Sequence, residues 1–328
     1  MFKDGMDYRK LQALGGGTLL VSLPKAWVTK SRLQQGDTVG LEETPSGAII
    51  VYPKDVVGAE EKSYVSVRAT GVDPQAVIRD VTAAYLLGYN IINVAGDRAQ
   101  IATVKKFLRE SVHGLLGLEV VGEEPTSLTL QFLLDIDTIP PEKLYRRMNN
   151  LARSMYVDAL QAAAEADPSL LEDVMQRDVD INRLFFLMVR LLRSTMADTR
   201  MAAKLGLTNV QCLDYRVAAH NVELLGDHSY ALASLLKPLI PLQASRSERL
   251  ADSGSRLAEL QDMATSYFLG AKGTAYPSFL AKANDAESFL DGLRKDDTLS
   301  EVADRLEDIR RLLVDIADLG EILYPFVK

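Results

Sequence analysis

The pattern of hydrophobic and polar positions divides the chain into three regions. Up to residue 55, short β-prone runs alternate with glycine-containing turns such as Gly15–Gly17 and Gly36-Asp37. Between residues 60 and 137, strand-like runs alternate with runs of helical periodicity. From residue 140 onward, alanine, leucine and charged residues dominate, and β-branched runs disappear. The pattern therefore predicts a multidomain α+β protein with domains at 1–55, 60–137 and 140–328.

The first region is predicted to form a small β domain. Its runs place strands at residues 8–14, 18–23, 38–43 and 48–52, and a short helix at 25–31. Pro24 favours the start of that helix, because a first helical turn does not need the N–H that proline lacks. Four strands this short stand at the lower limit of independent stability. We therefore expect the domain to complete its core by pairing with a second copy, as a homodimer.

The second region is predicted to be a small α/β domain. Its strands fall at 64–68, 90–94, 119–121 and 127–134, and its helices at 74–87 and 99–113. The turn Gly96-Asp97-Arg98 is too short for a dinucleotide-binding or P-loop pattern. We therefore expect this domain to connect and orient the two ends of the chain.

The last region is predicted to be all-helical. Helix-breaking residues such as Pro168, Gly206 and Pro241 recur along it. They leave six helical segments, at residues 141–167, 169–205, 208–237, 244–271, 277–295 and 298–324. Three helices followed by three more indicate a duplicated three-helix unit in one bundle, with repeats at about 141–239 and 240–328.

Cysteine content and hydropathy indicate the cellular compartment of the protein. The single cysteine, Cys212, excludes an internal disulfide. Residues 1–8 carry Lys3, Asp4 and Asp7, so they lack the apolar core of a signal peptide. No run approaches the roughly 18 apolar residues that a membrane span needs. We expect a cytoplasmic protein without membrane insertion.

Charge is spread unevenly along the chain. Residues 1–54 hold seven Lys and Arg and five Asp and Glu, a net charge of +2. The whole chain carries −8, so the remainder carries −10. A nucleic acid would therefore meet a favourable field only near the N-terminus, whereas the rest of the chain would attract cations.

Polar residues interrupt the apolar pattern of two predicted helices at helical spacing. One stripe, spaced four, three and four residues apart, consists of Arg216, His220, Glu223 and Asp227. Asp178 and Asn182 lie four apart on the preceding helix. Oxygen-bearing side chains on two facing helices can assemble a cation site. The alternative is that these acids line a solvated helix face.

The N-terminal region resembles a known domain family. The resemblance rests on three segments, RKLQALGGGTLLVSLPKAW, LQQGDTVGLEE and GAIIVYP, which are similar to the swapped-hairpin domain of AbrB and MazE proteins. Leu23-Pro24, Gly36-Asp37 and Val39 fall on the family's pattern. The resemblance implies an interlaced dimer that binds DNA.

The residues available for DNA contact are Arg9, Lys10, Lys25, Lys30 and Arg32. The short helix departs from the family, because Val28-Thr29 stands where a basic pair is often found. The alternative is therefore a domain that only dimerises, since a fold by itself does not deliver DNA binding.

The helical region resembles the PhoU family of phosphate uptake regulators, in the archaeal form that carries an AbrB-like domain. The segments that carry this resemblance are QRDVDINRLFFLM and RVAAHNVELLGDHSYALA. Glu223 and Asp227 match the family's E-x-x-x-D motif, and Asp178 and Asn182 form a variant of its first copy. The resemblance implies a divalent or trivalent metal ion, of open identity, at these four residues.

The second repeat departs further from the family. Asp318 falls on the aspartate of the motif, but Val314 stands where its glutamate would be. Glu287 and Asp291 have the required spacing on the fifth predicted helix. We expect a weaker metal site here, or none.

Together the resemblances imply a regulator of phosphate uptake and intracellular phosphate homeostasis. It would negatively control a phosphate ABC transporter, or its genes, through metal-dependent binding of the transporter ATPase or a related signalling protein. The alternative is a sequence-specific AbrB-type transcription factor whose helical part only oligomerises. No serine–histidine pairing, metalloprotease motif or activated lysine stands out, so we expect no enzymatic activity.

Overall fold

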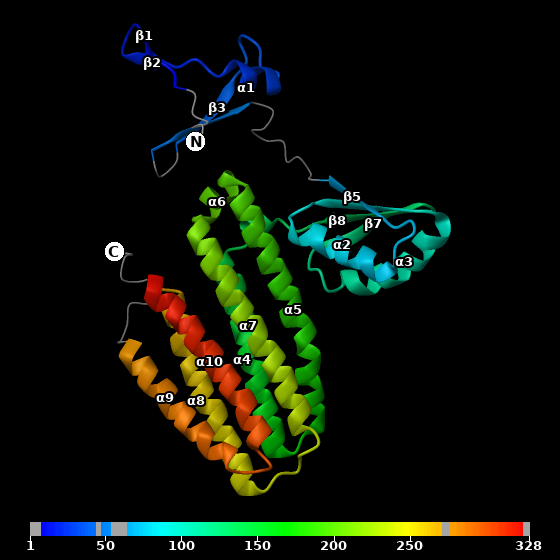
Figure 1. Ribbon diagram of the computed structural model, residues 1–328, viewed down its shortest axis with the longest axis vertical. Helices are drawn as coiled ribbons and strands as arrows, with labels where there is room; N and C mark the ends of the chain where they lie inside the picture. The colour runs from blue at the N-terminus through cyan, green and yellow to red at the C-terminus, as the bar shows by residue number, and fades with distance from the viewer. Residues whose placement is uncertain (1–7, 44–46, 54–63, 271–275, 324–328) are drawn as a thin grey trace, which may run out of the picture. The chain divides into compact units, whose positions relative to one another are not determined.

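The computed structural model describes residues 8–43, 47–53, 64–270 and 276–323. The chain forms two compact units, Met1–Lys62 and Ser63–Lys328 (Figure 1). The first is the small β domain, which we call the head. The second holds both the α/β domain and the helical bundle. The α+β multidomain fold predicted from the sequence is confirmed.

The head consists of two hairpins and one short helix. Strands β1 (Gln12–Leu14) and β2 (Thr18–Leu20) pair antiparallel, as do β3 (Val39–Glu43) and β4 (Ile49–Pro53), with α1 (Lys25–Lys30) between the hairpins. The first hairpin turns at Gly16 and Gly17, whose φ angles of +84° and +86° favour glycine.

The described part of the head has no core of its own. None of its described residues is buried, and the side chains of Leu41 and Ile49 are 70% and 66% exposed. Leu41 and Ile49 lie on the same face of their hairpin, because Leu41 pairs with Val51, two residues from Ile49. A single copy therefore leaves two large apolar side chains on one face of this hairpin in water.

The α/β domain is a four-stranded sheet with two helices. Its elements are β5 (Tyr64–Arg68), α2 (Pro74–Leu86), β6 (Ile91–Ala95), α3 (Arg98–Val112), β7 (Leu118–Glu124) and β8 (Ser127–Phe132). The strand order is β5-β6-β8-β7, with β5 parallel to β6 and the other pairs antiparallel. Alternate residues of β6 and β8, such as Ile92, Val94 and Leu130, are fully buried and join the core that includes α2 and α3.

The helical bundle contains α4 (Pro141–Glu165), α5 (Pro168–Ala197), α6 (Thr199–Leu205), α7 (Asn209–Leu236), α8 (Ala244–Phe268), α9 (Tyr276–Arg294) and α10 (Ser300–Leu323). Helices α4, α5 and α7 pack together, and so do α8, α9 and α10. Contacts of α4 with α8 and of α7 with α10 join the two groups (Figure 1). The two groups correspond to the two predicted repeats.

The segment predicted as one helix at 169–205 is in fact two. The backbone of Asp198 is extended (φ −122°, ψ 110°), and its side chain accepts a hydrogen bond from the N–H of Arg200 at 2.9 Å. Asp198 therefore ends α5 and caps α6, because aspartate competes for backbone hydrogen bonds that a continuing helix would use. The prediction of a single helix was wrong at this point.

Arg190 of α5 connects the bundle to the α/β domain through hydrogen bonds. Its side chain is 1% exposed and donates hydrogen bonds to the backbone oxygens of Tyr85 (2.6 Å), Gly88 (3.3 Å) and Tyr89 (3.0 Å), and to Asn90 Oδ1 (2.7 Å). These oxygens belong to the C-terminal end of α2 and the loop after it, where the helix dipole is negative. Burial lowers the pKa of Arg190 to about 10, which leaves it charged at neutral pH.

Candidate functional site: an acidic cluster between α5 and α7

Helices α5 and α7 approach each other closely at Gly226. A Cβ atom at this position would lie 2.8 Å from Ile181 Cγ2, which is closer than real carbon atoms come. Gly226 stands inside the segment from Glu223 to Asp227, so the motif carries the small residue that lets α7 approach α5. The acidic side chains on either side of Gly226 are thereby held against α5.

The structure brings the four predicted metal ligands of the first repeat to this junction, and we call them the acidic cluster: Asp178, Asn182, Glu223 and Asp227. Asn182 Nδ2 donates a hydrogen bond to Asp178 Oδ2 at 3.0 Å. Asp178 Oδ1 is buried and has no hydrogen-bond partner within the described ranges. Glu223 Oε2 lies 3.2 Å from His220 Nδ1. Asp227 is exposed, whereas the other three are half-buried.

The carboxylates of the acidic cluster repel one another. Burial raises the pKa of Asp178, and the negative charge of Asp227 raises it further. Burial likewise raises the pKa of Glu223, with a second contribution from Asp227 and a small one from Asp178. Asp178 and Glu223 therefore give up their protons less readily than they would in water, because each would place a negative charge beside others in a partly dry site.

A positive ion would relieve this repulsion. Carboxylate and amide oxygens are the ligands of hard cations, and the unpartnered oxygen of Asp178 supplies one such ligand. The residues present thus fit a hard metal ion. Among the described residues, however, no three His, Cys, Asp or Glu side chains are already positioned to hold one. Binding would require the side chains of Glu223 and Asp227 to adjust.

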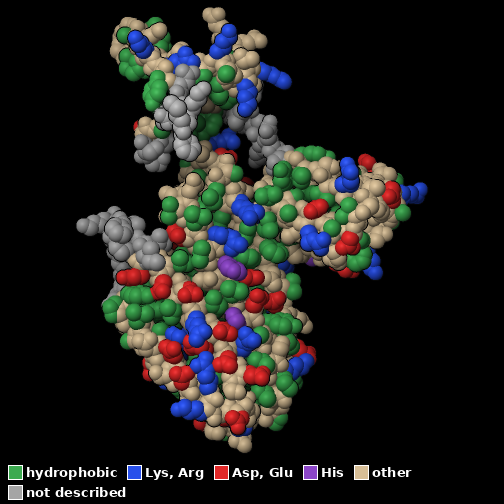
Figure 2. Space-filling model, in the orientation of Figure 1, with side chains coloured by type: hydrophobic (Ala, Val, Ile, Leu, Met, Phe, Trp, Pro, Cys, Tyr) green, Lys and Arg blue, Asp and Glu red, His purple; other side chains and the backbone are tan. Residues whose placement is uncertain are grey.

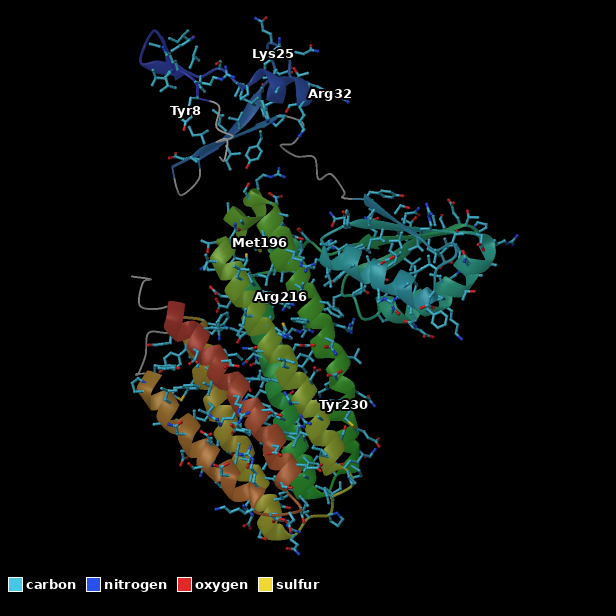
Figure 3. The ribbon with its side chains drawn as sticks, in the orientation of Figure 1. Tyr8, Lys25, Arg32, Met196, Arg216 and Tyr230 are labelled. Atoms are coloured by element: carbon cyan, nitrogen blue, oxygen red, sulfur yellow. The ribbon has the colours of Figure 1, made fainter. Side chains whose placement is uncertain are left out.

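Aromatic and basic side chains border the acidic cluster on the side of the α7 N-terminus. The ring of Phe185 stacks on His220 with centroids 5.9 Å apart, and the guanidinium of Arg216 lies 4.8 Å from the centroid of the same ring. Arg216 and Met196 lie toward one end of the bundle in Figure 3. Figure 2 shows histidine and acidic side chains on the same side of the bundle. Phe185 and Gly226 were not singled out from the sequence, since a lone aromatic or glycine in a helical pattern carries no signal of its own.

An exposed apolar stripe continues from this border along α7. Val210, Leu213 and Val217 are 61%, 56% and 47% exposed and follow one another at helical spacing. Met196, near the end of α5, is 45% exposed. The spacing of these residues in the sequence is that of a buried helix face, and only the structure shows that the face is open.

The predicted residues of the second repeat are paired with other groups. Glu287 lies 3.5 Å from Arg310, Asp291 lies 2.6 Å from Arg294, and Asp318 accepts a hydrogen bond from the hydroxyl of Tyr276. The guanidinium of Arg310 is 7% exposed and also makes two hydrogen bonds of 2.7 Å to Glu307. An arginine thus already supplies positive charge here, so these residues do not fit a metal ion as those of the first repeat do.

The five basic side chains of the head that were predicted to contact DNA are exposed: Arg9, Lys10, Lys25, Lys30 and Arg32. Lys25 and Arg32 stand at the two ends of the α1 segment (Figure 3). Solvent exposure is what a DNA contact requires, but it is also normal for any lysine or arginine. Their geometry alone does not separate DNA binding from dimerisation.

Two further observations concern the single cysteine and the hydropathy of the helices. Cys212 is buried, and burial raises the pKa of its thiol, which disfavours the reactive thiolate. Within the described ranges, none of the helices combines the length and apolar character of a membrane span.

Comparison with known families finds two matches along the chain. A model of the PhoU domain matches residues 145–236, which contain nearly all of the first three-helix group. A model described as antidote-toxin recognition MazE, bacterial antitoxin, matches residues 12–58, which lie within the head. No curated protein and no solved structure matches the chain. Both resemblances read from the sequence are confirmed.

Proposed function

Because the chain carries a PhoU domain behind a MazE-type antitoxin domain, we propose that it regulates phosphate homeostasis by binding partners. The PhoU family is associated with phosphate-transport signalling, and both families are regulatory. The finer proposal is that the protein restrains a phosphate ABC transporter, through its ATPase or a related signalling protein. A metal ion held by the acidic cluster would control that contact.

The observation that supports this proposal most is the convergence of acids from α5 and α7. Asp178, Asn182, Glu223 and Asp227 would hold the metal ion, and the ion would supply positive charge on a surface that is otherwise acidic. The apolar stripe on α7 lies beside the acidic cluster and offers area for a protein partner. A bound ion would therefore change the charge of the surface that such a partner meets.

The metal site can be tested by removing two charges without changing side-chain size. Glu223→Gln with Asp227→Asn should lose most of the metal that the purified parent retains after dialysis, as measured by elemental analysis. Glu287→Gln with Asp291→Asn is the matched control, because it makes the same change at the same spacing on α9, where arginines already neutralise the acids. Equal metal content in the parent and the first variant would contradict the proposed site.

The regulatory role needs a test in cells. The tagged parent, expressed under phosphate-replete conditions, should capture a phosphate-transporter ATPase or a related signalling protein. The Glu223→Gln, Asp227→Asn variant should capture less of it, whereas the α9 control should capture as much as the parent. Failure of the parent to capture any component of phosphate transport would reject the transporter-directed form of the proposal.

DNA binding by the head is a second proposal, supported by the MazE match and by the net charge of +2 on residues 1–54. Arg9→Ala with Lys10→Ala should weaken binding to the protein's own promoter region. The slope of log affinity against log salt should also fall by roughly one per removed phosphate contact. The control is Arg79→Ala with Lys106→Ala, two exposed charges of the α/β domain. No affinity of the parent for DNA at low salt would leave the head as a dimerisation domain.

A further inference from the structure

A hollow lined by two arginines lies where the α/β domain meets α4 and α5. It has a volume of about 290 Å³ and is lined by Leu116, Arg147, Leu151, Asp180, Arg183 and Leu184. Leu116 comes from the loop between α3 and β7, whereas the other five come from the bundle. We call it the arginine hollow. The acidic cluster contributes none of its lining residues.

The two arginines of the hollow have unused hydrogen-bonding capacity. Arg183 Nη1 donates to Asp180 Oδ1 at 3.2 Å, but Arg183 Nε is buried and has no partner within the described ranges. Arg147 is exposed to solvent and makes no hydrogen bond or ion pair with any residue that the structure describes. Its neighbour Arg146, by contrast, pairs with Glu142 at 2.9 Å. The hollow thus combines two positive charges with one negative charge.

A buried guanidinium N–H without an acceptor is costly, because the group has lost its water without replacing it. A small shift of the Arg183 side chain would bring this N–H to an anion in the hollow, which would then supply the missing acceptor. Arginine binds phosphate through two parallel N–H···O bonds, and a tetrahedral phosphate group has enough oxygens to face two guanidinium groups at once. A carboxylate has two oxygens and matches only one such fork, and Asp180 already offers one to Arg183.

From these contacts we propose that the arginine hollow binds a phosphate group, held by Arg147 and Arg183. The volume stands near the lower end of small-molecule sites, and Leu116, Leu151 and Leu184 give the hollow an apolar side. Both inorganic phosphate and a small phosphate monoester therefore suit it. The proposal rests on the proposed function in one respect, since it gives a regulator of phosphate homeostasis a direct contact with phosphate.

The hollow is placed where a ligand can affect both domains. Leu116 belongs to the α/β domain, and its backbone oxygen accepts a hydrogen bond from the hydroxyl of Tyr85 at 2.9 Å. Arg183 belongs to α5, next to Asn182 of the acidic cluster. A ligand in the hollow therefore contacts the helix that also carries half of the acidic cluster. Its occupancy is expected to strengthen the attachment of the α/β domain to α5.

Calorimetric titration of the full-length protein tests the proposal. Sodium phosphate, glycerol phosphate and sodium acetate are titrated separately at constant ionic strength, in a buffer that contains a metal chelator. The chelator removes any route by which phosphate binds through a metal at the acidic cluster. Both phosphate compounds, or either one, should bind saturably at one site per chain, and acetate should not.

The variants identify the site. Arg147→Gln and Arg183→Gln should each weaken phosphate binding about tenfold or more, the effect of losing a charge-assisted hydrogen bond. Arg146→Gln removes the same charge one residue away and should leave the affinity unchanged. Circular dichroism confirms that each variant is folded.

Absence of saturable binding by both phosphate compounds, or equal weakening by Arg146→Gln and Arg147→Gln, would overturn the proposal. Neither outcome affects the metal-content test of the acidic cluster, so the two proposals fail separately. Tighter binding of glycerol phosphate than of inorganic phosphate would show that the apolar side of the hollow contributes. The reverse order would identify free phosphate as the ligand.

Discussion

At the scale of single residues, Asp178 shows how burial and neighbouring charge act on a carboxylate of the acidic cluster. One of its oxygens accepts a hydrogen bond from Asn182, while the other is buried without a partner within the described ranges. Burial and the charge of Asp227 raise its pKa above the ordinary value of 3.8. The folded chain therefore holds this proton to a higher pH than the unfolded chain does. The free energy of unfolding therefore falls as the pH rises from the ordinary pKa of the unfolded chain through the raised pKa of the folded chain.

Neutralising Asp178 should for this reason stabilise the metal-free protein. In the presence of chelator at neutral pH, Asp178→Asn is expected to raise the Tm above that of the parent, and the difference should shrink as the pH is lowered toward 3.8. Asp180→Asn is the matched control on the same helix. It removes an exposed charge that pairs with Arg183 and should not raise the Tm. A lower Tm for Asp178→Asn would show that its carboxylate is stabilising without metal.

At the scale of elements, the close contact of α5 and α7 depends on Gly226. A methyl group at this position would overlap Ile181, and both residues lie in buried helix segments. The helices would have to separate, or Ile181 would have to leave its rotamer. Either adjustment would move the carboxylates of Glu223 and Asp227 away from Asp178.

Gly226→Ala should therefore destabilise the protein by about 1–3 kcal/mol, the usual effect of overpacking, as measured by urea unfolding. The control is Gly292→Ala on α9, where a new Cβ would meet no atom within 4 Å. There the substitution should stabilise by roughly 0.5–1 kcal/mol, because alanine has the higher helix propensity. Similar effects of the two changes would mean that α5 and α7 tolerate a wider spacing.

Arg190 stabilises a second contact between elements, the packing of α2 on α5. Its guanidinium donates hydrogen bonds to three backbone oxygens at the end of α2 and in the loop after it. Arg190→Met should destabilise the protein by about 3 kcal/mol or more, because several acceptors lose their partner at once. Arg193→Met, one turn away and exposed, should change stability by less than about 0.5 kcal/mol. Hydrogen exchange should show that the amides of α2 lose protection first in Arg190→Met.

At the scale of the whole molecule, the head is the part for which we propose pairing with a second copy. Its described residues include no buried side chain, and one face of the β3–β4 hairpin exposes Leu41 and Ile49. Isolated two-stranded hairpins are marginally stable in water. Pairing of two heads would bury this surface, which agrees with the dimer proposed from the MazE match.

Charges placed on that face should prevent pairing. Leu41→Glu with Ile49→Glu is expected to convert a dimeric parent into a monomer, as measured by light scattering. Val121→Glu is the control, because Val121 is 50% exposed on β7 and lies outside the head. A variant that remains dimeric would show that the helical part, and not the head, joins the two chains.

The sequence by itself determined the order and type of nearly every element. Periodicity and turn residues are local properties, so the strands of the head, the α/β alternation and most helix boundaries follow from neighbouring residues. The break at Asp198 was missed because aspartate is common enough within helices that only its extended backbone reveals the cap. The motif at Glu223 and Asp227 could also be recognised in the sequence, because both residues lie on one helix and their spacing is fixed.

Only the tertiary structure decided which charges meet. Asp178 and Asp227 lie on different helices, Arg190 finds its acceptors one hundred or more residues away in the chain, and Arg310 neutralises acids of the second repeat. The arginine hollow likewise combines α4 and α5 with a loop of the α/β domain. Local rules cannot report such pairings, because a charge acts across space on whatever the fold brings near it. The sequence thus determined the helices that carry the acidic cluster, whereas the packing of α5 on α7 decided its geometry.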